Sequence, residues 1–247
     1  MAIPFQIDPT FTAWTASALG ASLGGAFLAL LAVMRFNIHR LRASVLFQRW
    51  SVWAVIAPVY SAAVLLGAPG LFVLMSFLVV QGLREYAAIV GLPRKRKNAL
   101  IAGGLIAAPA AYFSPVFAYG LLAAVGFITV KHMAIGLDRK HECHAILTFF
   151  GWAWIAWMLA HLMLIHQHIR GGDGLLLAVG MAVALSDVGA FVVGKTFGRH
   201  ALAPRLSPNK TIEGVAGNVI GAYAGFGIMY FAIPDQLIGW PIAILPA

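Results

Sequence analysis

Long apolar runs separated by short polar stretches dominate this chain. A helix needs about 20 apolar residues to cross the roughly 30 Å hydrocarbon core of a bilayer, and eight runs approach or reach that length. The predicted spans cover residues 13–34, 50–67, 70–90, 98–113, 115–130, 144–165, 174–194 and 215–233. A further apolar run at 237–247 is a candidate start of a ninth span. The pattern predicts an all-α, polytopic membrane helix bundle, with residues 1–247 forming a single transmembrane domain.

Two connections between predicted spans are very short and contain helix breakers. Residues 67–70 read Gly-Ala-Pro-Gly and residues 114–115 read Ser-Pro, and both are typical of tight turns. The spans at 98–113 and 115–130 are each short, so they could instead form one long helix. That alternative reverses the side of the membrane on which every later loop lies.

Composition excludes a soluble or disordered protein. The chain is 61% hydrophobic and only 10% charged, whereas a soluble domain has about 25% charged residues and a disordered one has low hydrophobicity. The net charge of +9 would suggest nucleic acid for a soluble protein. In a membrane protein, Lys and Arg gather in cytoplasmic loops, so we expect a lipid bilayer and no nucleic acid as partner.

The distribution of the basic residues orients the bundle. With eight spans, every one of the 17 Lys and Arg residues except Arg170 falls on one face, whereas a merged helix over 98–130 would divide them almost evenly. The positive-inside rule therefore favours the separate pair, an outside N-terminus and cytoplasmic basic loops in a bacterial-type inner or plasma membrane. Residues 1–10 contain no Lys or Arg, so we expect the first apolar run to stay as an anchor instead of being cleaved as a signal peptide.

The segment 186–217 differs from ordinary membrane helices. Asp187 lies inside an apolar span, about two turns before its expected cytoplasmic end. A carboxylate there costs about 2.5–3.5 kcal/mol, which indicates either a functional acid or a structural acid paired with a neighbouring helix. Gly194 lies near the same helix face and would let another backbone or a ligand approach closely. Residues 189–196 match the Walker A pattern, but we expect no P-loop because residues 190–193 continue an apolar helix.

A polar cytoplasmic loop is expected at 195–214. Its cations are Lys195, Arg199, Arg205 and Lys210, and its hydroxyls include Ser207 and Thr211. We expect Thr211 or Ser207 to cap the next helix, with Glu213 in its first turn. A helix N-terminus beside cations and hydroxyls suits a phosphate group, although a solvated positive-inside loop has the same composition. Glycines at 214, 217, 221 and 225 predict a small-residue face for close helix contact.

Two consecutive sequence patterns occupy this segment. The first, D-x-G-A-x-x-x-G-[KR]-x-F-G-[RK], begins at Asp187, and the second, L-x-P-x-[LI]-S-P-x-K-T-x-E-G, begins at Leu202 and ends at Gly214. Together they resemble the signature of phosphatidate cytidylyltransferases, the CDP-diacylglycerol synthases. Leu83-Arg84-Glu85-Tyr86 is similar to an upstream element of that family. The resemblance implies transfer of a cytidylyl group from CTP to phosphatidic acid, which gives CDP-diacylglycerol and pyrophosphate in phospholipid biosynthesis.

The resemblance also implies roles for individual residues. The expected catalytic residues are Asp187, Lys210 and Glu213. The expected substrate-binding residues are Lys195, Arg199, Arg205, Ser207 and Thr211. Magnesium is the implied cofactor, and Asp187 and Glu85 are its candidate ligands in this chain. CTP and phosphatidic acid are the implied partners, and a homodimer is left open.

The family's longest signature lies further downstream. It reads K-R-x4-K-D, a P-G-H-G-G turn and then D-R-x-D, and its acids are expected to hold the metal; these 247 residues do not contain it. Either the sequence is an incomplete member of the family or its subgroup has lost that metal site. Two other functions also stay open: a transporter for an anionic lipid or solute that uses Asp187 and the basic loop, and an inactive truncated relative that serves as a scaffold.

Overall fold

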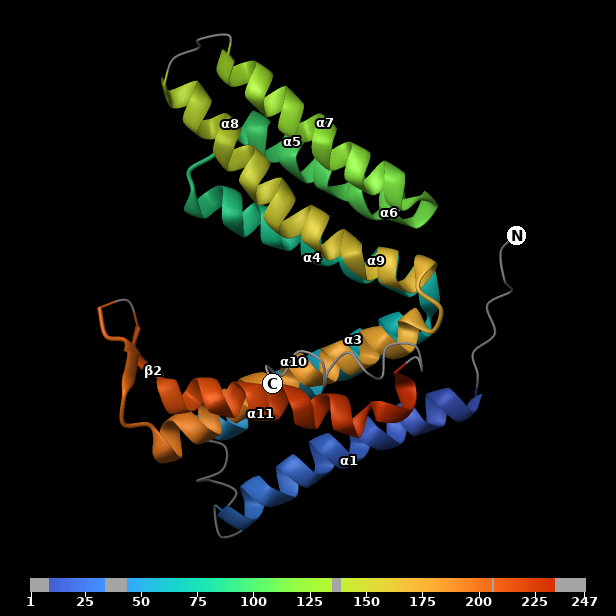
Figure 1. Cartoon of the computed structure of the whole chain (residues 1–247), viewed down its shortest axis with the longest axis vertical. Helices are drawn as coiled ribbons and strands as arrows, with labels where there is room; N and C mark the ends of the chain where they lie inside the picture. The colour runs from blue at the N-terminus through green and yellow to red at the C-terminus, as the bar shows by residue number, and fades with distance from the viewer. Residues whose placement is uncertain (1–8, 34–43, 135–138, 206, 234–247) are drawn as a thin grey trace, which may run out of the picture. The chain divides into compact units, whose positions relative to one another are not determined.

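The structure is a computed structural model that describes residues 9–33, 44–134, 139–205 and 207–233 (Figure 1). The chain divides into two compact units, Met1–Leu65 with Gly171–Ala247 (unit 1) and Leu66–Arg170 (unit 2). Apart from one two-stranded hairpin, the regular elements of the described residues are helices, which confirms the predicted all-α class. The candidate ninth span at 237–247 lies outside the described residues, and the single domain stays a prediction.

Helix α3 contacts both α1 and α10 in unit 1. The elements of this unit are α1 (Pro9–Val33), α3 (Val45–Leu65), α10 (Gly172–Phe197), β1 (Ala201–Ala203), β2 (Ser207–Thr211), α11 (Ile212–Ile228) and the short 3-10 helix η2 (Tyr230–Ala232). Trp50 on α3 donates from Nε1 to the carbonyl of Leu23 on α1 at 3.0 Å. Tyr60, further along α3, donates from its hydroxyl to the carbonyl of Leu176 on α10 at 2.8 Å. These two bonds connect α3 to α1 and to α10.

Helices α10 and α11 lie side by side with their backbones in contact (Figure 1). Gly214, Gly217, Gly221 and Gly225 are the buried residues of α11. A Cβ atom added to Gly217 would lie 2.4 Å from the carbonyl oxygen of Gly189, and one added to Gly221 would lie 2.2 Å from that of Leu185. No side chain fits at such distances, so this interface requires glycine. The predicted small-residue face is confirmed.

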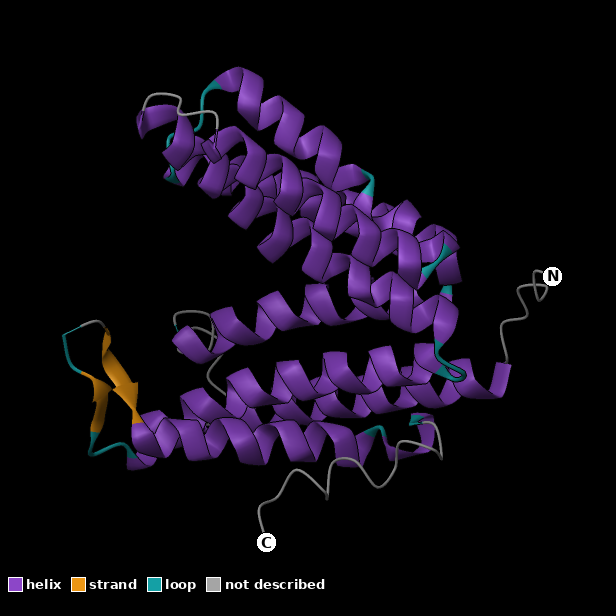
Figure 2. Ribbon diagram, turned by 45° about the horizontal axis from the view of Figure 1, so that its top comes forward, coloured by secondary structure: helices purple, strands orange, loops and turns teal. Residues whose placement is uncertain are grey.

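A β-hairpin connects these two helices. Strand β1 pairs with β2 in antiparallel fashion, with Ala201 opposite Thr211 and Ala203 opposite Ser207. Figure 2 shows the hairpin at the end of the α10–α11 pair. The prediction of a plain loop at 195–214 was wrong, because α10 continues to Phe197 and the following backbone satisfies its polar groups by pairing with itself.

Unit 2 consists of helices that bury narrow apolar faces. They are α4 (Gly67–Ile89), α5 (Arg94–Leu105), α6 (Ala107–Phe113), α7 (Pro115–Ala134), α8 (Arg139–Gly151), the π-helix η1 (Trp152–Trp157) and α9 (Met158–His168). The buried residues of α4 recur every four positions, at Leu71, Met75, Val79, Leu83 and Ala87. That spacing keeps them on one side of the helix, which packs against α5, η1 and α9.

Three predicted boundaries can be compared with the structure. The turn expected at 67–70 lies at residues 66–67 instead, where Gly67 takes a positive φ of 66°. Pro69 then lies in the first turn of α4, where proline is tolerated. The basic run at 94–97, expected in a loop, forms the first turn of α5 after an extended Pro93. The chain does break at Ser114 between α6 and α7, so the region is not one continuous helix.

Several described helices have the length, composition and exposure of membrane helices. Three are long and apolar enough to cross a bilayer, namely Gly67–Ile89, Glu142–His168 and Gly172–Phe197, and Pro115–Lys131 is a shorter apolar helix. Large apolar side chains such as Val73, Ile89 and Val116 are exposed, as is expected of surfaces that face lipid. The chain is a helical membrane protein. The Walker A match lies inside the continuous helix α10, in agreement with the expectation of no P-loop.

The glycine contact between α10 and α11 gives a stability prediction. Gly217→Ala places a Cβ 2.4 Å from the Gly189 oxygen and 2.6 Å from the Val193 Cβ, and overpacking of this kind costs about 1–3 kcal/mol or more. We expect a clearly lower midpoint of thermal unfolding in detergent, followed by circular dichroism. Gly227→Ala on the same helix is the matched control, because nothing lies within 4 Å of its Cβ position. Equal midpoints for the two variants would contradict the close contact.

Candidate functional site

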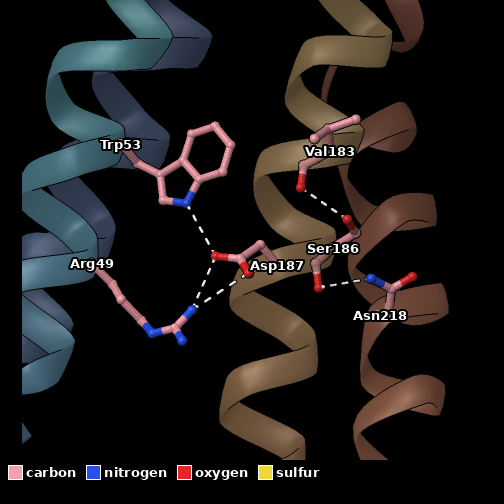
Figure 3. A network of polar contacts seen from close by, with 6 residues as sticks. All are labelled: Arg49, Trp53, Val183, Ser186, Asp187 and Asn218. Atoms are coloured by element: carbon pink, nitrogen blue, oxygen red, sulfur yellow. Dashed lines mark hydrogen bonds and ion pairs between the residues drawn. The ribbon is translucent and has the colours of Figure 1, made fainter. Parts of the chain in front are cut away.

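Asp187 on α10 is paired with two side chains of α3 (Figure 3). The Nη1 atom of Arg49 donates to Oδ1 at 3.4 Å and to Oδ2 at 3.3 Å, and Trp53 Nε1 donates to Oδ2 at 3.4 Å. Arg49 and Trp53 are four residues apart, so they point from the same face of α3. Of the two interpretations that the sequence left open for Asp187, the structure therefore contains the pairing with a neighbouring helix.

A second interaction holds the Arg49 side chain. Its guanidinium carbon lies 4.2 Å from the ring centre of Phe191, and the ammonium nitrogen of Lys195 lies 5.6 Å from the same ring. Asp187, Phe191 and Lys195 follow one another at intervals of four residues on α10 and share a face. The side chains of Arg49 and Asp187 remain 44% and 48% exposed. This cluster of one acid, two cations and an aromatic ring is therefore partly exposed.

Next to Asp187, α10 is also linked to α11. Asn218 on α11 donates from Nδ2 to the carbonyl of Ser186 at 3.4 Å, and the Ser186 hydroxyl donates to the carbonyl of Val183 at 2.8 Å (Figure 3). Polar contacts thus connect this part of α10 to α3 through Asp187 and to α11 through Ser186. Asp187 lies ten residues before the end of α10 at Phe197, or about 15 Å at 1.5 Å per residue. That is almost three turns, more than the two expected, because α10 is longer than predicted.

Glu213, in the first turn of α11, anchors the beginning of the hairpin segment. Its Oε2 accepts from the backbone N–H groups of Arg199 at 3.1 Å and His200 at 3.3 Å, and its Oε1 lies 2.6 Å from Nδ1 of His200. The hydrogen bond from His200, followed by those from backbone N–H groups of Glu213 and Arg199, lowers the pKa of the carboxyl from 4.5 to about 2. The residue expected to be catalytic thus fixes the chain that leaves α10.

Thr211 caps α11, as the sequence predicted. Its Oγ1 accepts from the backbone N–H of Gly214 at 3.1 Å, whereas Ser207, the other candidate cap, lies at the start of β2. The same hydroxyl oxygen would lie 3.1 Å from a Cβ added to Gly194 and 3.0 Å from one added to Gly198. The close approach expected beside Gly194 is therefore made by the start of α11.

The expected phosphate-binding residues gather around the hairpin. Lys195 lies in the last turn of α10, Arg199 just after it, Arg205 between the strands and Lys210 in β2, and all four side chains are exposed. Ser207 and Thr211 are partly exposed. Four cations within one short segment give this end of unit 1 a positive surface. Except for Glu85, the expected site residues all lie within residues 187–213.

Glu85 belongs to unit 2. It is exposed on α4 in unit 2 and accepts a hydrogen bond from Gln81 of the same helix at 2.5 Å, whereas Asp187 belongs to unit 1. Across residues 9–33, 44–134, 139–205 and 207–233, no three His, Cys, Asp or Glu side chains lie together as metal ligands. Both oxygens of Asp187 already accept hydrogen bonds. The expected magnesium therefore stays a prediction, with no described residue assigned to it.

Three residues of this arrangement, Arg49, Trp53 and His200, were not predicted as site residues from the sequence. Arg49 counted only as one of the orienting bases, although an Arg followed four residues later by Trp at the start of an apolar run is a weak signal for a paired helix face. Trp53 was not singled out. His200 lies between the two signature patterns, and only its neighbourhood to them could have drawn attention to it.

The anchoring by Glu213 predicts a pH-dependent hairpin. The folded-state pKa of about 2 is below the usual 4.5, so the stabilisation is present above about pH 4.5 and is lost as the pH falls toward 2. Glu213→Ala should remove it at pH 7, with several-fold faster amide hydrogen exchange at Arg199 and His200. Glu142→Ala, at the start of α8, is the control. Unchanged protection in Glu213→Ala would exclude the anchor.

Comparisons with known proteins agree with the signature. A phosphatidate cytidylyltransferase of Mycobacterium leprae is 40% identical over 76 residues, which cover 31% of this chain and 24% of that protein. One from Staphylococcus haemolyticus is 28% identical over 126 residues, or 50% and 46% of the two chains. Uncharacterized protein YnbB of Escherichia coli is 31% identical over 160 residues, or 60% and 51%.

The chain spans between about a quarter and a half of the length of these relatives. No solved structure matches it significantly. The sequence profile of the Cytidylyltransferase family matches residues 47–247, which begin just before Arg49 and include both signature patterns. This protein belongs to the cytidylyltransferase family.

Proposed function

We propose that this protein transfers a cytidylyl group from CTP to phosphatidic acid, forming CDP-diacylglycerol and pyrophosphate. One observation carries the proposal: in a member of the cytidylyltransferase family, the exposed cations of the signature all lie along the continuous α10–hairpin–α11 segment. Relatives with the name phosphatidate cytidylyltransferase supply the substrate class. No observation in the described residues favours a transporter or an inactive scaffold.

The chemistry requires charge neutralisation more than proton transfer. An oxygen of the lipid phosphate forms a bond to the α-phosphorus of CTP, and the bond from that phosphorus to the oxygen bridging to the β-phosphorus breaks, releasing pyrophosphate. With both substrates fully ionised, the negative charges of reactants and products are equal, so no general base is needed. Phosphoryl-type transfers of this kind depend on positioning and on electrostatic stabilisation.

The residues of the segment fit those two tasks. Lys195, Arg199, Arg205 and Lys210 would bind substrate phosphates through charge-assisted hydrogen bonds. The Thr211 hydroxyl accepts from Gly214 N and keeps its own proton to donate, and Ser207 adds a second hydroxyl. We assign Asp187 and Glu213 to positioning, because both carboxylates already accept hydrogen bonds. Magnesium is proposed as a requirement of the reaction, with no described residue assigned to it.

We also propose the finer topology expected from the sequence. It has eight spans, an outside N-terminus and the signature segment on the cytoplasmic side of a bacterial-type inner membrane. CTP is found on that side. The distribution of the 17 basic residues supports this topology. The homodimer stays a prediction.

Cysteine labelling tests the topology. In a variant whose native cysteine is removed by Cys143→Ser, the cysteine introduced by Arg96→Cys should react with impermeant maleimide only from the cytoplasmic face. Labelling from outside would reverse the topology.

The phosphate-binding role gives a prediction for catalysis. Lys210→Ala should lower kcat/KM for cytidylyl transfer roughly 10- to 100-fold, since a hydrogen bond to a charged group is worth about 1.5–3 kcal/mol. The measurement follows radiolabel from [α-³²P]CTP into phosphatidic acid with purified protein, detergent and magnesium. Lys95→Ala, an exposed lysine in the first turn of α5, should retain native activity. Absence of transfer by the native protein would contradict the proposed function, and equal activity of the two variants would contradict the role of Lys210.

A further inference from the structure

We propose that Arg49 on α3 binds a substrate phosphate together with Lys195. Arg49 lies outside both signature patterns, and this inference rests on the proposed function because it extends the same phosphate site to a second helix. The ligand chemistry is a phosphate group that carries two negative charges, and it can come from phosphatidic acid or from CTP.

The Arg49 side chain is held in place, and some of its hydrogen-bond donors remain available. A guanidinium has five N–H donors, and among the described residues its acceptors are the two oxygens of Asp187, both reached from the single nitrogen Nη1. The Phe191 ring lies against the guanidinium at 4.2 Å. With 44% of the side chain exposed, the remaining donors form a fixed fork, which is the geometry that binds phosphate in two-point fashion.

The charges around Phe191 favour an anion. Arg49 and Lys195 approach the same ring, at 4.2 Å and 5.6 Å from its centre, and like charges gathered in this way repel each other. Asp187 is the acid bonded to Arg49, so these three residues leave one net positive charge. A phosphate bound between Arg49 and Lys195 would offset this excess positive charge and screen the repulsion between the two cations.

The location favours a ligand that reaches the site along the helices. Arg49 lies in the second turn of α3, which begins at Val45, and Lys195 lies in the last turn of α10. Because α10 is long and apolar enough to span a membrane, a phosphate on a lipid can reach its flank without leaving the bilayer surface. Arg199, Arg205 and Lys210 on the hairpin side then remain for the phosphates of the nucleotide.

Direct binding tests this assignment without depending on turnover. Binding of phosphatidic acid in neutral detergent micelles and binding of CTP in solution are measured separately for native protein, Arg49→Gln, Arg49→Lys and Arg94→Gln. We expect Arg49→Gln to lower the binding affinity for one of the two ligands about tenfold or more, because a charged hydrogen-bond donor is lost. The weakened ligand identifies the source of the phosphate. Arg49→Lys should be intermediate, since it keeps the charge and loses the fork.

Arg94→Gln is the matched control. Arg94 is exposed at the start of α5 in unit 2, and its loss should leave both affinities unchanged. A correctly folded Arg49→Gln protein that binds both ligands with native affinity would overturn the assignment. Phosphatidylcholine, which has no doubly charged phosphate, should bind with the same affinity to all four proteins.

A double variant separates phosphate binding from simple neutralisation of Asp187. Arg49→Gln with Asp187→Asn leaves no carboxylate at position 187, so a purely structural Arg49 predicts that binding returns to the native affinity, and that result would overturn the proposal. We expect binding to stay weak. Arg49-dependent binding in a protein that transfers no label would support the assignment and count against the proposed function. If the Arg49 variants transfer label and bind both ligands with native affinity, the proposed function is supported and the assignment of Arg49 is contradicted.

Discussion

The backbone contact between α10 and α11 is the constraint on which the rest of the site depends. At Gly217 and Gly221 the space for a Cβ is occupied by carbonyl oxygens of α10, so the two helices can lie this close only where α11 has no side chain. This contact fixes the start of α11 beside the end of α10, and Glu213 can then reach the N–H groups of Arg199 and His200. It also leaves the face of α10 that carries Asp187, Phe191 and Lys195 available to α3.

The acidic residues of this segment hold parts of the chain in place, whereas its basic residues are exposed. Asp187 accepts from Arg49 and Trp53, and Glu213 accepts from the chain that leaves α10; neither is a free carboxylate. The cations, by contrast, are exposed. A reaction between two ionised phosphates has no net proton to transfer, so positioned cations are what it requires. The low pKa of Glu213 has the same meaning, since a carboxyl that remains ionised throughout the physiological range holds the hairpin without titrating.

Local signals in the sequence predicted much of this structure, and long-range pairing accounts for most of what they missed. Apolar runs predicted the helices, the glycine spacing predicted the close face of α11, and Thr211 was one of the two residues expected as its cap. The hairpin was not predicted because its strands are short and show no alternation of apolar and polar residues. In addition, Pro204 follows β1 and Pro208 lies within β2. Arg49 was missed because its partner is 138 residues away, and no local pattern specifies which helices meet.

The most direct measurement is a cryo-electron microscopy structure of the protein with phosphatidic acid and a CTP analogue whose α–β bridging oxygen is replaced. Our account predicts nucleotide phosphates within hydrogen-bond distance of cations on the α10–hairpin–α11 segment, with a further phosphate beside Arg49. The α10–α11 glycine contact should be unchanged. Nucleotide bound elsewhere, for instance at the basic first turn of α5, with the signature segment free of phosphate, would contradict it.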